Sequence, residues 1–182
     1  RAYLIGDGRL AESDDKIKED CIRPVWTDDD KLFTINKVVE HDGTEEDRAA
    51  QFIKAAIKAR KGYRGSGNPT LYCSEDLLTE MLLLTDGVGR DLYDYEKLCK
   101  KIRVKEIVTV PVMENATREK DGENRGLLGI IVNMNDYDVG ADKGGAINMF
   151  DDFDIDYNAQ KYLMETRCSG ALVKPFSAIT LE

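Results

Sequence analysis

Carboxylates near the end of the chain have the residue types and spacing that metal binding requires. Four of them fall within six positions: Asp151, Asp152, Asp154 and Asp156. Counted from the third of these, oxygen-bearing side chains occupy positions 1, 3, 5 and 12 of an EF-hand-like calcium loop, namely Asp154, Asp156, Asn158 and Glu165. This pattern defines one hypothesis for the chain, a small divalent-metal-binding module or a metal-dependent enzyme that uses the acidic residues from Asp154 to Glu165.

Three features of the same segment weaken the calcium hypothesis. Ala159 stands where the loop needs glycine for its sharp turn, and Lys161 stands where an aliphatic residue is usual. The flanking residues follow the pattern of strands rather than helices. We therefore expect the acids to lie on the solvated faces of a strand and its turn, or at a contact between subunits, and we assign no metal ligand.

The rest of the sequence offers little to nucleophilic or redox catalysis. The single histidine, His41, lies in a polar Glu-His-Asp-Gly turn, and no G-x-S-x-G or G-x-x-x-x-G-K-[ST] motif occurs. The four cysteines form no C-x-x-C pair, which predicts reduced thiols rather than a zinc or redox site. We expect no enzyme activity, no catalytic residue and no cofactor.

Composition and charge indicate an ordinary globular protein. Of the 182 residues, 42% are hydrophobic and 34% are charged, and the formal net charge is −9. A chain of this length can form a core without metals or disulfides, and its negative charge argues against general nucleic-acid binding. Basic residues gather at 54–64 and 97–105, where we expect exposed helix faces. No run approaches the roughly 18 apolar residues of a membrane span.

Caps and periodicity predict three helices. Thr44 and Asp47 have the spacing of a capping box, and apolar residues then recur with helical period: Ala49, Phe52, Ile53, Ala56 and Ile57. Ser74 is expected to cap a second helix, whose buried side would include Leu77 and Met81. A shorter helix is expected at 95–101, after a glycine-rich turn at 86–90.

Apolar runs predict the strands. Short strands are expected at 31–39 and 70–73, and near-continuous apolar runs at 107–112 and 127–132 predict central strands covered on both faces. Between the last two, residues 114–125 are charged and predicted to be mobile.

The last third of the chain has the alternation of a long strand. From Gln160 onward, even positions such as Tyr162 and Met164 are apolar or neutral, whereas odd positions carry charge at Lys161 and Glu165. This period of two predicts strands with one solvated face. Residues 9–143 therefore indicate an α+β or α/β domain, and residues 146–182 indicate an all-β segment.

Short motifs in this final segment resemble one known family. They include Glu165-Thr166-Arg167 and the Lys174-Pro175 turn, and Gly6-Asp7-Gly8 stands in the expected order upstream. Together they resemble the tailed-phage or prophage major capsid proteins of the Hong Kong 97 fold. The likeness extends over most of the chain and is specific chiefly in the last forty or so positions.

The resemblance implies an α+β capsid fold in three parts. Residues 1–8 would end the family's spine helix, 9–145 would form the axial domain, a mixed sheet flanked by helices, and 146–182 would supply β strands of the peripheral domain. Relative to the family, the sequence would be a fragment that lacks the amino-terminal arm, the extended loop and most of the spine helix.

The same resemblance implies a structural role. The subunit would self-assemble into the hexamers and pentamers of an icosahedral shell around double-stranded DNA, which it would hold without sequence-specific binding. Its partners would be further copies of itself and other virion proteins such as scaffold and portal, with no membrane. The location would be the virion capsid, assembled in the bacterial host cytoplasm. The residues that we expect at subunit contacts are Arg90, Asp91, Tyr93, Asp154, Asp156, Glu165 and Arg167.

Overall fold

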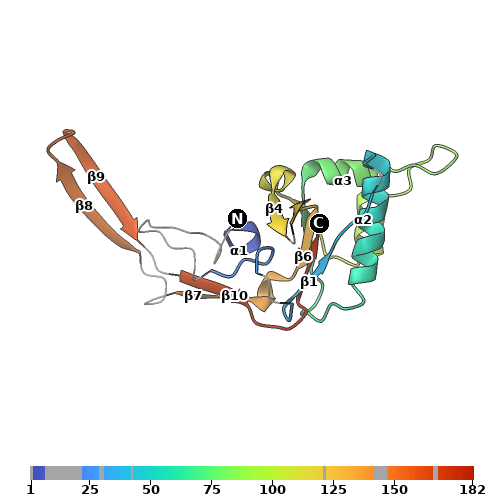
Figure 1. Ribbon diagram of the computed structural model, residues 1–182, viewed down its shortest axis with the longest axis horizontal. Helices are drawn as coiled ribbons and strands as arrows, with labels where there is room; N and C mark the ends of the chain where they lie inside the picture. Colours follow the sequence, from blue (N-terminus) through green and yellow to red (C-terminus); the bar gives the residue numbers. More distant parts are fainter. Residues whose placement is uncertain are drawn as a thin grey trace.

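The computed structural model describes residues 2–6, 22–28, 31–41, 43–120, 122–141, 147–165 and 168–182. Its centre is a five-stranded mixed sheet with the order β1-β11-β6-β2-β3 (Figure 1). The bounds of these strands are Thr34–Lys37, Ala178–Leu181, Gly129–Val132, Thr70–Cys73 and Ile107–Thr109. β1 is parallel to β11 and β2 is parallel to β3, whereas β6 runs antiparallel to both of its neighbours.

Three helices pack beside this sheet, and local sequence determines where each begins. They are α2 (Glu45–Ala59), α3 (Glu75–Leu82) and α4 (Tyr95–Ile102). The Thr44 hydroxyl accepts a hydrogen bond from the Asp47 N–H at 3.3 Å, and the Ser74 hydroxyl accepts one from the Leu77 N–H at 3.3 Å. Both predicted caps are therefore confirmed. The mixed sheet and its helices together confirm the α+β class of the fold.

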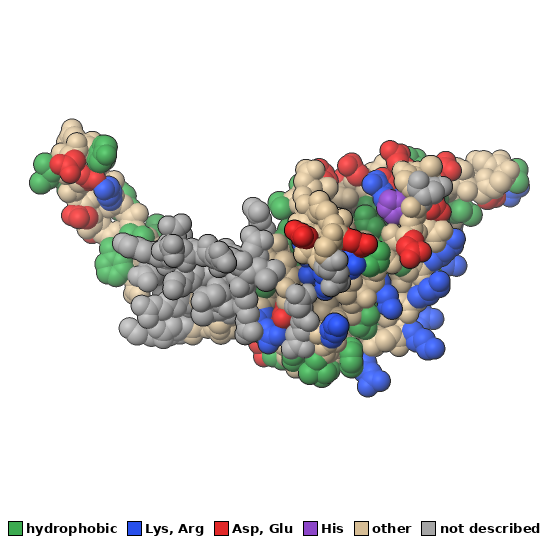
Figure 2. Space-filling model, viewed as in Figure 1, with side chains coloured by type: hydrophobic (Ala, Val, Ile, Leu, Met, Phe, Trp, Pro, Cys, Tyr) green, Lys and Arg blue, Asp and Glu red, His purple; other side chains and the backbone are tan. Residues whose placement is uncertain are grey.

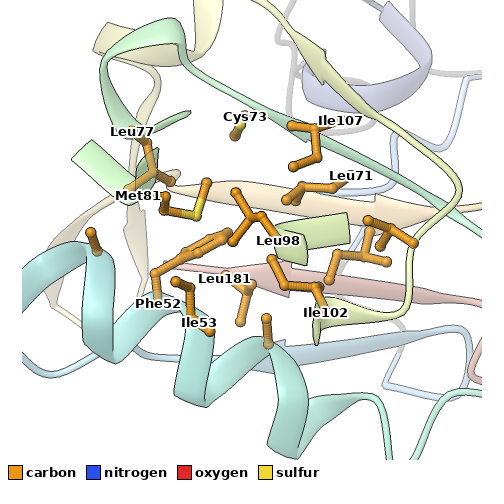
Figure 3. Close-up of a cluster of buried hydrophobic side chains, with 14 of the residues drawn as sticks. Phe52, Ile53, Leu71, Cys73, Leu77, Met81, Leu98, Ile102, Ile107 and Leu181 are labelled. Atoms are coloured by element: carbon orange, nitrogen blue, oxygen red, sulfur yellow. The ribbon is translucent and has the colours of Figure 1, made fainter. Parts of the chain in front are cut away.

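The core lies on both faces of the sheet. Figure 3 shows the larger cluster, in which Phe52 and Ile53 of α2 meet Leu98 of α4 and Leu71 of β2. Ile131 belongs to this cluster, whereas the adjacent Ile130 and Val132 face a second cluster formed with α1 (Ala2–Ile5), residues 22–28 and the 3₁₀ helix η2 (Pro111–Asn115). β6 is therefore buried on both faces, as its apolar run predicted.

The other predicted central strand lies at an edge. β3 ends at Thr109 and pairs with β2 alone among the described strands, and Pro111 then opens η2. Proline has no N–H to donate to a ladder, which explains why the strand stops before it. The prediction of a central strand at 107–112 is wrong.

The charged segment that was predicted to be mobile is folded. It contains η2, followed by a hairpin of β4 (Thr117–Lys120) and β5 (Glu123–Gly126). Arg118 and Arg125 on this hairpin form ion pairs with Glu182, whose side chain is fully buried. These ion pairs with Glu182 explain why a charged segment can pack against the sheet.

The final segment is not one separate β unit. β7 (Tyr137–Ala141), which follows the 3₁₀ helix η3 (Met134–Asp136), pairs with β10 (Cys168–Leu172), and β8 (Asn148–Asp154) pairs with β9 (Ala159–Glu165). β11, in contrast, lies inside the five-stranded sheet between β1 and β6. All four of its residues are buried, so it needs cover on both faces. The five-stranded sheet therefore includes one strand, β11, from beyond the boundary expected near residue 145.

Candidate functional site

Among the described residues, exposed large apolar side chains are grouped on the β8–β9 hairpin. Figure 1 shows this two-stranded sheet standing away from the helices and the five-stranded sheet. Its tip is a turn in which the Asp156 N–H donates to the Asp154 carboxylate at 3.1 Å, and Asn158 adopts a φ of 47°. A two-stranded hairpin alone in water is marginally stable, so its surroundings decide how well it is ordered.

Both faces of this hairpin carry large apolar side chains. Met149 pairs with Met164 on one face, and Phe150 pairs with Leu163 on the other. The exposed fractions of these four side chains lie between 53% and 69%. The prediction that this segment forms strands is confirmed. The face that carries Lys161 also carries the apolar pair Phe150 and Leu163, and neither face is covered within the described chain. Contiguous apolar surface of this kind marks contacts with other molecules.

Charge is concentrated at the tip of the hairpin. Asp154 forms an ion pair with Lys161, whose ammonium lies 6.0 Å from the centre of the Tyr157 ring. The hydrogen bond from Lys161 holds the pKa of Asp154 below its ordinary value. These contacts fix the turn, and they satisfy the Asp154 carboxylate without a metal ion.

The register separates the residues of the EF-hand-like pattern. Asp154 pairs with Ala159 next to the turn, whereas Glu165 pairs with Asn148 at the other end of the hairpin. Six residues of extended strand span about 20 Å, far more than the radius of a calcium coordination sphere. Across the described residues, no three side chains of the types His, Cys, Asp or Glu come together as a metal site. The geometry does not favour the metal hypothesis.

The second group of predicted contact residues lies on a turn after α3. Leu92 N–H donates to the Leu84 carbonyl at 2.8 Å, which closes the base of the turn, and the Asp86 carboxylate accepts from the Val88 and Arg90 N–H groups at 2.8 and 3.0 Å. The hydrogen bond from Arg90, followed by that from Val88, lowers the pKa of Asp86. Backbone hydrogen bonds and the Asp86 carboxylate together therefore hold this turn.

The predicted contact residues are not brought together into one site. Arg90 and Asp91 are exposed on this turn, while Tyr93 is half-buried and packs against the larger core cluster. Figure 1 shows the turn projecting from the opposite end of the molecule to the hairpin that bears Asp154, Asp156 and Glu165. Arg167 lies outside the described residues. The two groups can therefore serve two different contacts, and their role stays a prediction.

A buried ionic cluster was missed at the level of sequence. The Glu182 carboxylate accepts from the Trp26 indole N–H at 2.7 Å and pairs with Arg118 at 2.5 Å and Arg125 at 3.9 Å. The Arg118 guanidinium also donates to the Trp26 carbonyl at 2.7 Å. Trp26 and Glu182 are distant in sequence from each other and from the two arginines, and nothing in the local pattern indicated the cluster. It ties the β4–β5 hairpin to the sheet.

A second buried carboxylate holds three loops together. Asp136 is 1% exposed, accepts from the Ser66 N–H at 2.5 Å and pairs with Lys174 at 3.1 Å. Burial by itself raises the pKa of Asp136, but the hydrogen bonds from Ser66 and the Lys174 ammonium outweigh burial, so its pKa lies below the ordinary value. This arrangement is structural, because the carboxylate is enclosed by its own partners.

Comparison with known proteins gives a likeness of fold. No family model matches the sequence, and no curated protein matches it. A solved chain from Gordonia phage Cozz has a similar structure, with a TM-score of 0.52 and 14% sequence identity, and the match covers 100% of this chain and 57% of that chain. This chain therefore spans little more than half the length of the phage chain that it resembles. At this identity the likeness shows an α+β fold shared with a phage protein.

One further property concerns membranes. Within the part of the chain that the structure describes, no helix combines the length and apolarity needed to span a bilayer.

Proposed function

We propose that this chain is a structural subunit of a tailed-phage or prophage virion, the major capsid protein of the Hong Kong 97 fold. In this proposal it self-assembles into hexamers and pentamers of an icosahedral shell around double-stranded DNA, within the bacterial host cytoplasm. Its partners are further copies of itself, with scaffold and portal proteins, and it acts without catalysis, cofactor or membrane. The fold shared with the phage chain agrees with this role.

The observation that supports the proposal most is the β8–β9 hairpin. Phe150 and Leu163 on one face, and Met149 and Met164 on the other, are more than half exposed in the single chain. Complete burial of a fully exposed side chain of this size gains about 1.5–3 kcal/mol, and each of these four has more than half of that gain still available. Within the described chain these side chains stay exposed, whereas a shell subunit can bury both faces of the hairpin against its neighbours.

The domain scheme is part of the same proposal. Residues 1–8 end the spine helix, 9–145 form the axial domain and 146–182 contribute to the peripheral domain, with β11 returning to the sheet. The turn that bears Arg90, Asp91 and Tyr93 then faces the capsomer axis. The segment from Asp151 to Glu165, which bears Asp154 and Asp156, faces the outer edge and neighbouring capsomers.

The test is negative-stain electron microscopy of the whole protein expressed in bacteria. We expect closed shells, or rings of five and six subunits. Replacing the cross-strand pair by Phe150→Ser with Leu163→Ser should abolish them while leaving the circular dichroism spectrum unchanged. The control is Leu32→Ser with Val173→Ser, which removes apolar side chains of similar exposure from the body of the molecule.

Two results would contradict the proposal. One is a wild-type protein that forms only small monodisperse particles, also when scaffold is supplied. The other is the formation of shells whose yield is the same for the hairpin variant and the control, because the observation that supports the proposal would then have no part in assembly.

A further inference from the structure

Helix α2 carries opposite charges on two of its exposed flanks. Glu45, Glu46 and Asp47 lie in its first turn, whereas Lys54 and Lys58 lie exposed farther along. Figure 2 shows the consequence on the surface, with acidic side chains gathered over the start of α2 and over α3, and basic side chains along the lower part of α2. Neither flank is covered within the described chain, and the two differ in shape as well as in charge.

The acidic flank is a hollow of about 490 Å³ between α2 and α3. Arg48 and Glu80 pair with each other inside it, with an Nε–O distance of 2.9 Å, and so neutralise one another. The remaining carboxylates lining the hollow are Glu45, Glu46 and Asp76, and within the described residues none of them forms an ion pair. Leu83, at its rim, is 68% exposed. We call this surface the acidic groove.

The basic flank consists of two adjoining hollows of about 400 and 480 Å³ that share Lys37 and Lys58. Lys54, Lys61 and Arg64 also line them, against a single carboxylate, Glu40. In the part of the chain that the structure describes, the four lysines form no ion pair. Val38, which also lines this surface, is 51% exposed. We call it the basic groove.

We propose that the acidic groove of one copy binds the basic groove of a second copy. The inference rests on the proposed self-assembly and names the surfaces that would form one contact of it. Each groove has unpaired charge of one sign beside an exposed aliphatic side chain, Leu83 in one and Val38 in the other, so the two surfaces are complementary in both respects. Complementary potentials set partner choice, orientation and association rate.

The arrangement of the grooves determines the symmetry of the contact. The two grooves are different surfaces of the same chain, so their pairing is heterologous, and a heterologous contact forms a ring when its rotation closes. Each subunit then uses its acidic groove on one side and its basic groove on the other. This is the geometry that a capsomer requires.

Nucleic acid is the other occupant that a basic groove could take, and the charge pattern disfavours it. The formal net charge of the chain is −9. Glu45 and Glu46 lie on the same helix as Lys54, about 12–14 Å from it along the helix axis. A phosphate backbone that runs past the basic groove would meet this negative surface.

The test exchanges the charges of the two grooves. One variant carries Lys54→Glu and Lys58→Glu, and the other carries Glu46→Lys and Asp76→Lys. The control for the first is Lys100→Glu with Lys101→Glu, which makes the same charge change on the exposed side of α4. Association of the whole protein is measured by sedimentation velocity at about 50 mM and about 500 mM NaCl, since the higher salt screens exposed charges.

We expect the wild type and the control to associate at low salt and each groove variant to lose at least tenfold in association constant. Mixing the two groove variants in equal amounts should restore association, because each supplies the charge that the other lacks. In a ring the two must alternate, so the mixture should form six-membered rings but no five-membered rings. Circular dichroism establishes that the variants are folded.

Several outcomes would overturn the inference. The first is a wild type that does not associate, and the second is an association constant that both charge reversals leave unchanged. The third is a mixture of the two groove variants that stays dissociated. The last is a wild type that binds a DNA duplex, when only the Lys54→Glu, Lys58→Glu variant loses that binding. Shells that form normally from both groove variants would reject this contact but leave the capsid proposal intact. Salt-sensitive association that behaves as expected without any shell would reject the capsid proposal but keep the contact.

Discussion

The five-stranded sheet and the β8–β9 hairpin use the same kinds of side chain under opposite conditions. In β6 and β11 every residue is buried, with apolar neighbours on both faces of the sheet. In the hairpin, Phe150, Leu163, Met149 and Met164 also lie on both faces of paired strands, yet all are exposed. Composition and pairing alone therefore do not bury a strand: the described chain covers both faces of the sheet, and it leaves both faces of the hairpin uncovered.

The largest difference in the free energy of unfolding should come from replacing one phenylalanine in the core and one in the hairpin. Phe52→Ala removes a fully buried ring of the larger core cluster and should lower the free energy of unfolding by about 3–5 kcal/mol. Phe150→Ala removes a ring that is already half exposed and should change it by less than about 0.5 kcal/mol. Urea denaturation of both variants is the measurement. Equal losses would mean that the hairpin is packed within one chain.

The second comparison sets a buried ion pair against an exposed one. Glu182→Gln leaves Arg118 buried without its carboxylate and should cost about 3 kcal/mol in the free energy of unfolding. Lys161→Gln breaks the pair with Asp154 at the exposed tip of the hairpin and should leave that free energy unchanged. Thermal and urea unfolding followed at the Trp26 fluorescence would measure both. A small effect of Glu182→Gln would contradict the role given to the cluster.

The third prediction concerns pH. Because the pKa of Asp136 in the folded chain lies below that of the unfolded chain, its stabilisation is fully present above about pH 4 and is lost as pH falls through the folded-state value. Asp136→Asn should cost about 1.5–3 kcal/mol at neutral pH. It should also flatten the loss of stability on acidification, measured by urea unfolding between about pH 6 and 3. Parallel pH profiles of wild type and variant would contradict it.

The smallest effect is expected at the turn after α3. Asp86→Ala removes the acceptor for the Val88 and Arg90 N–H groups, so hydrogen exchange at these two amides should accelerate. Because the turn projects from the body, the midpoint of global unfolding should not move. Unchanged exchange at both amides would mean that the turn does not depend on this carboxylate.

Local features of the sequence predicted the helices. The strand order of the sheet and the folding of the charged segment depend on residues that are distant in sequence. Thr44 and Ser74 cap helices whose start depends on the next three residues, so sequence was sufficient there. The segment with Arg118 was misread as mobile, because its partner Glu182 lies 64 positions away. Likewise, nothing within residues 178–181 specifies that the strand pairs with β1 and β6.

In the β8–β9 hairpin too, the local pattern was predictable from sequence and the long-range arrangement was not. The alternation around Tyr162 predicted strands, but exposure of both hairpin faces depends on which elements lie nearby in space, and the sequence does not disclose that. The EF-hand-like spacing failed for a related reason, because antiparallel register places Glu165 at the far end of the hairpin from Asp154. The lysines of α2 were correctly predicted to be exposed, whereas their grouping with Lys37 required the fold.

The central position of β11 has a consequence for the order of events during synthesis. β1 is made early, at residues 34–37, but its neighbour in the sheet emerges about 140 residues later. Until residues 178–181 leave the ribosome, the strand that pairs with both β1 and β6 is missing. Pairing between strands that are far apart in sequence is slow. The apolar β8–β9 hairpin emerges before that strand is made. The nascent chain therefore exposes the apolar side chains of this hairpin before its own sheet is complete, and partly folded chains with exposed apolar surface and unpaired strand edges are prone to aggregate.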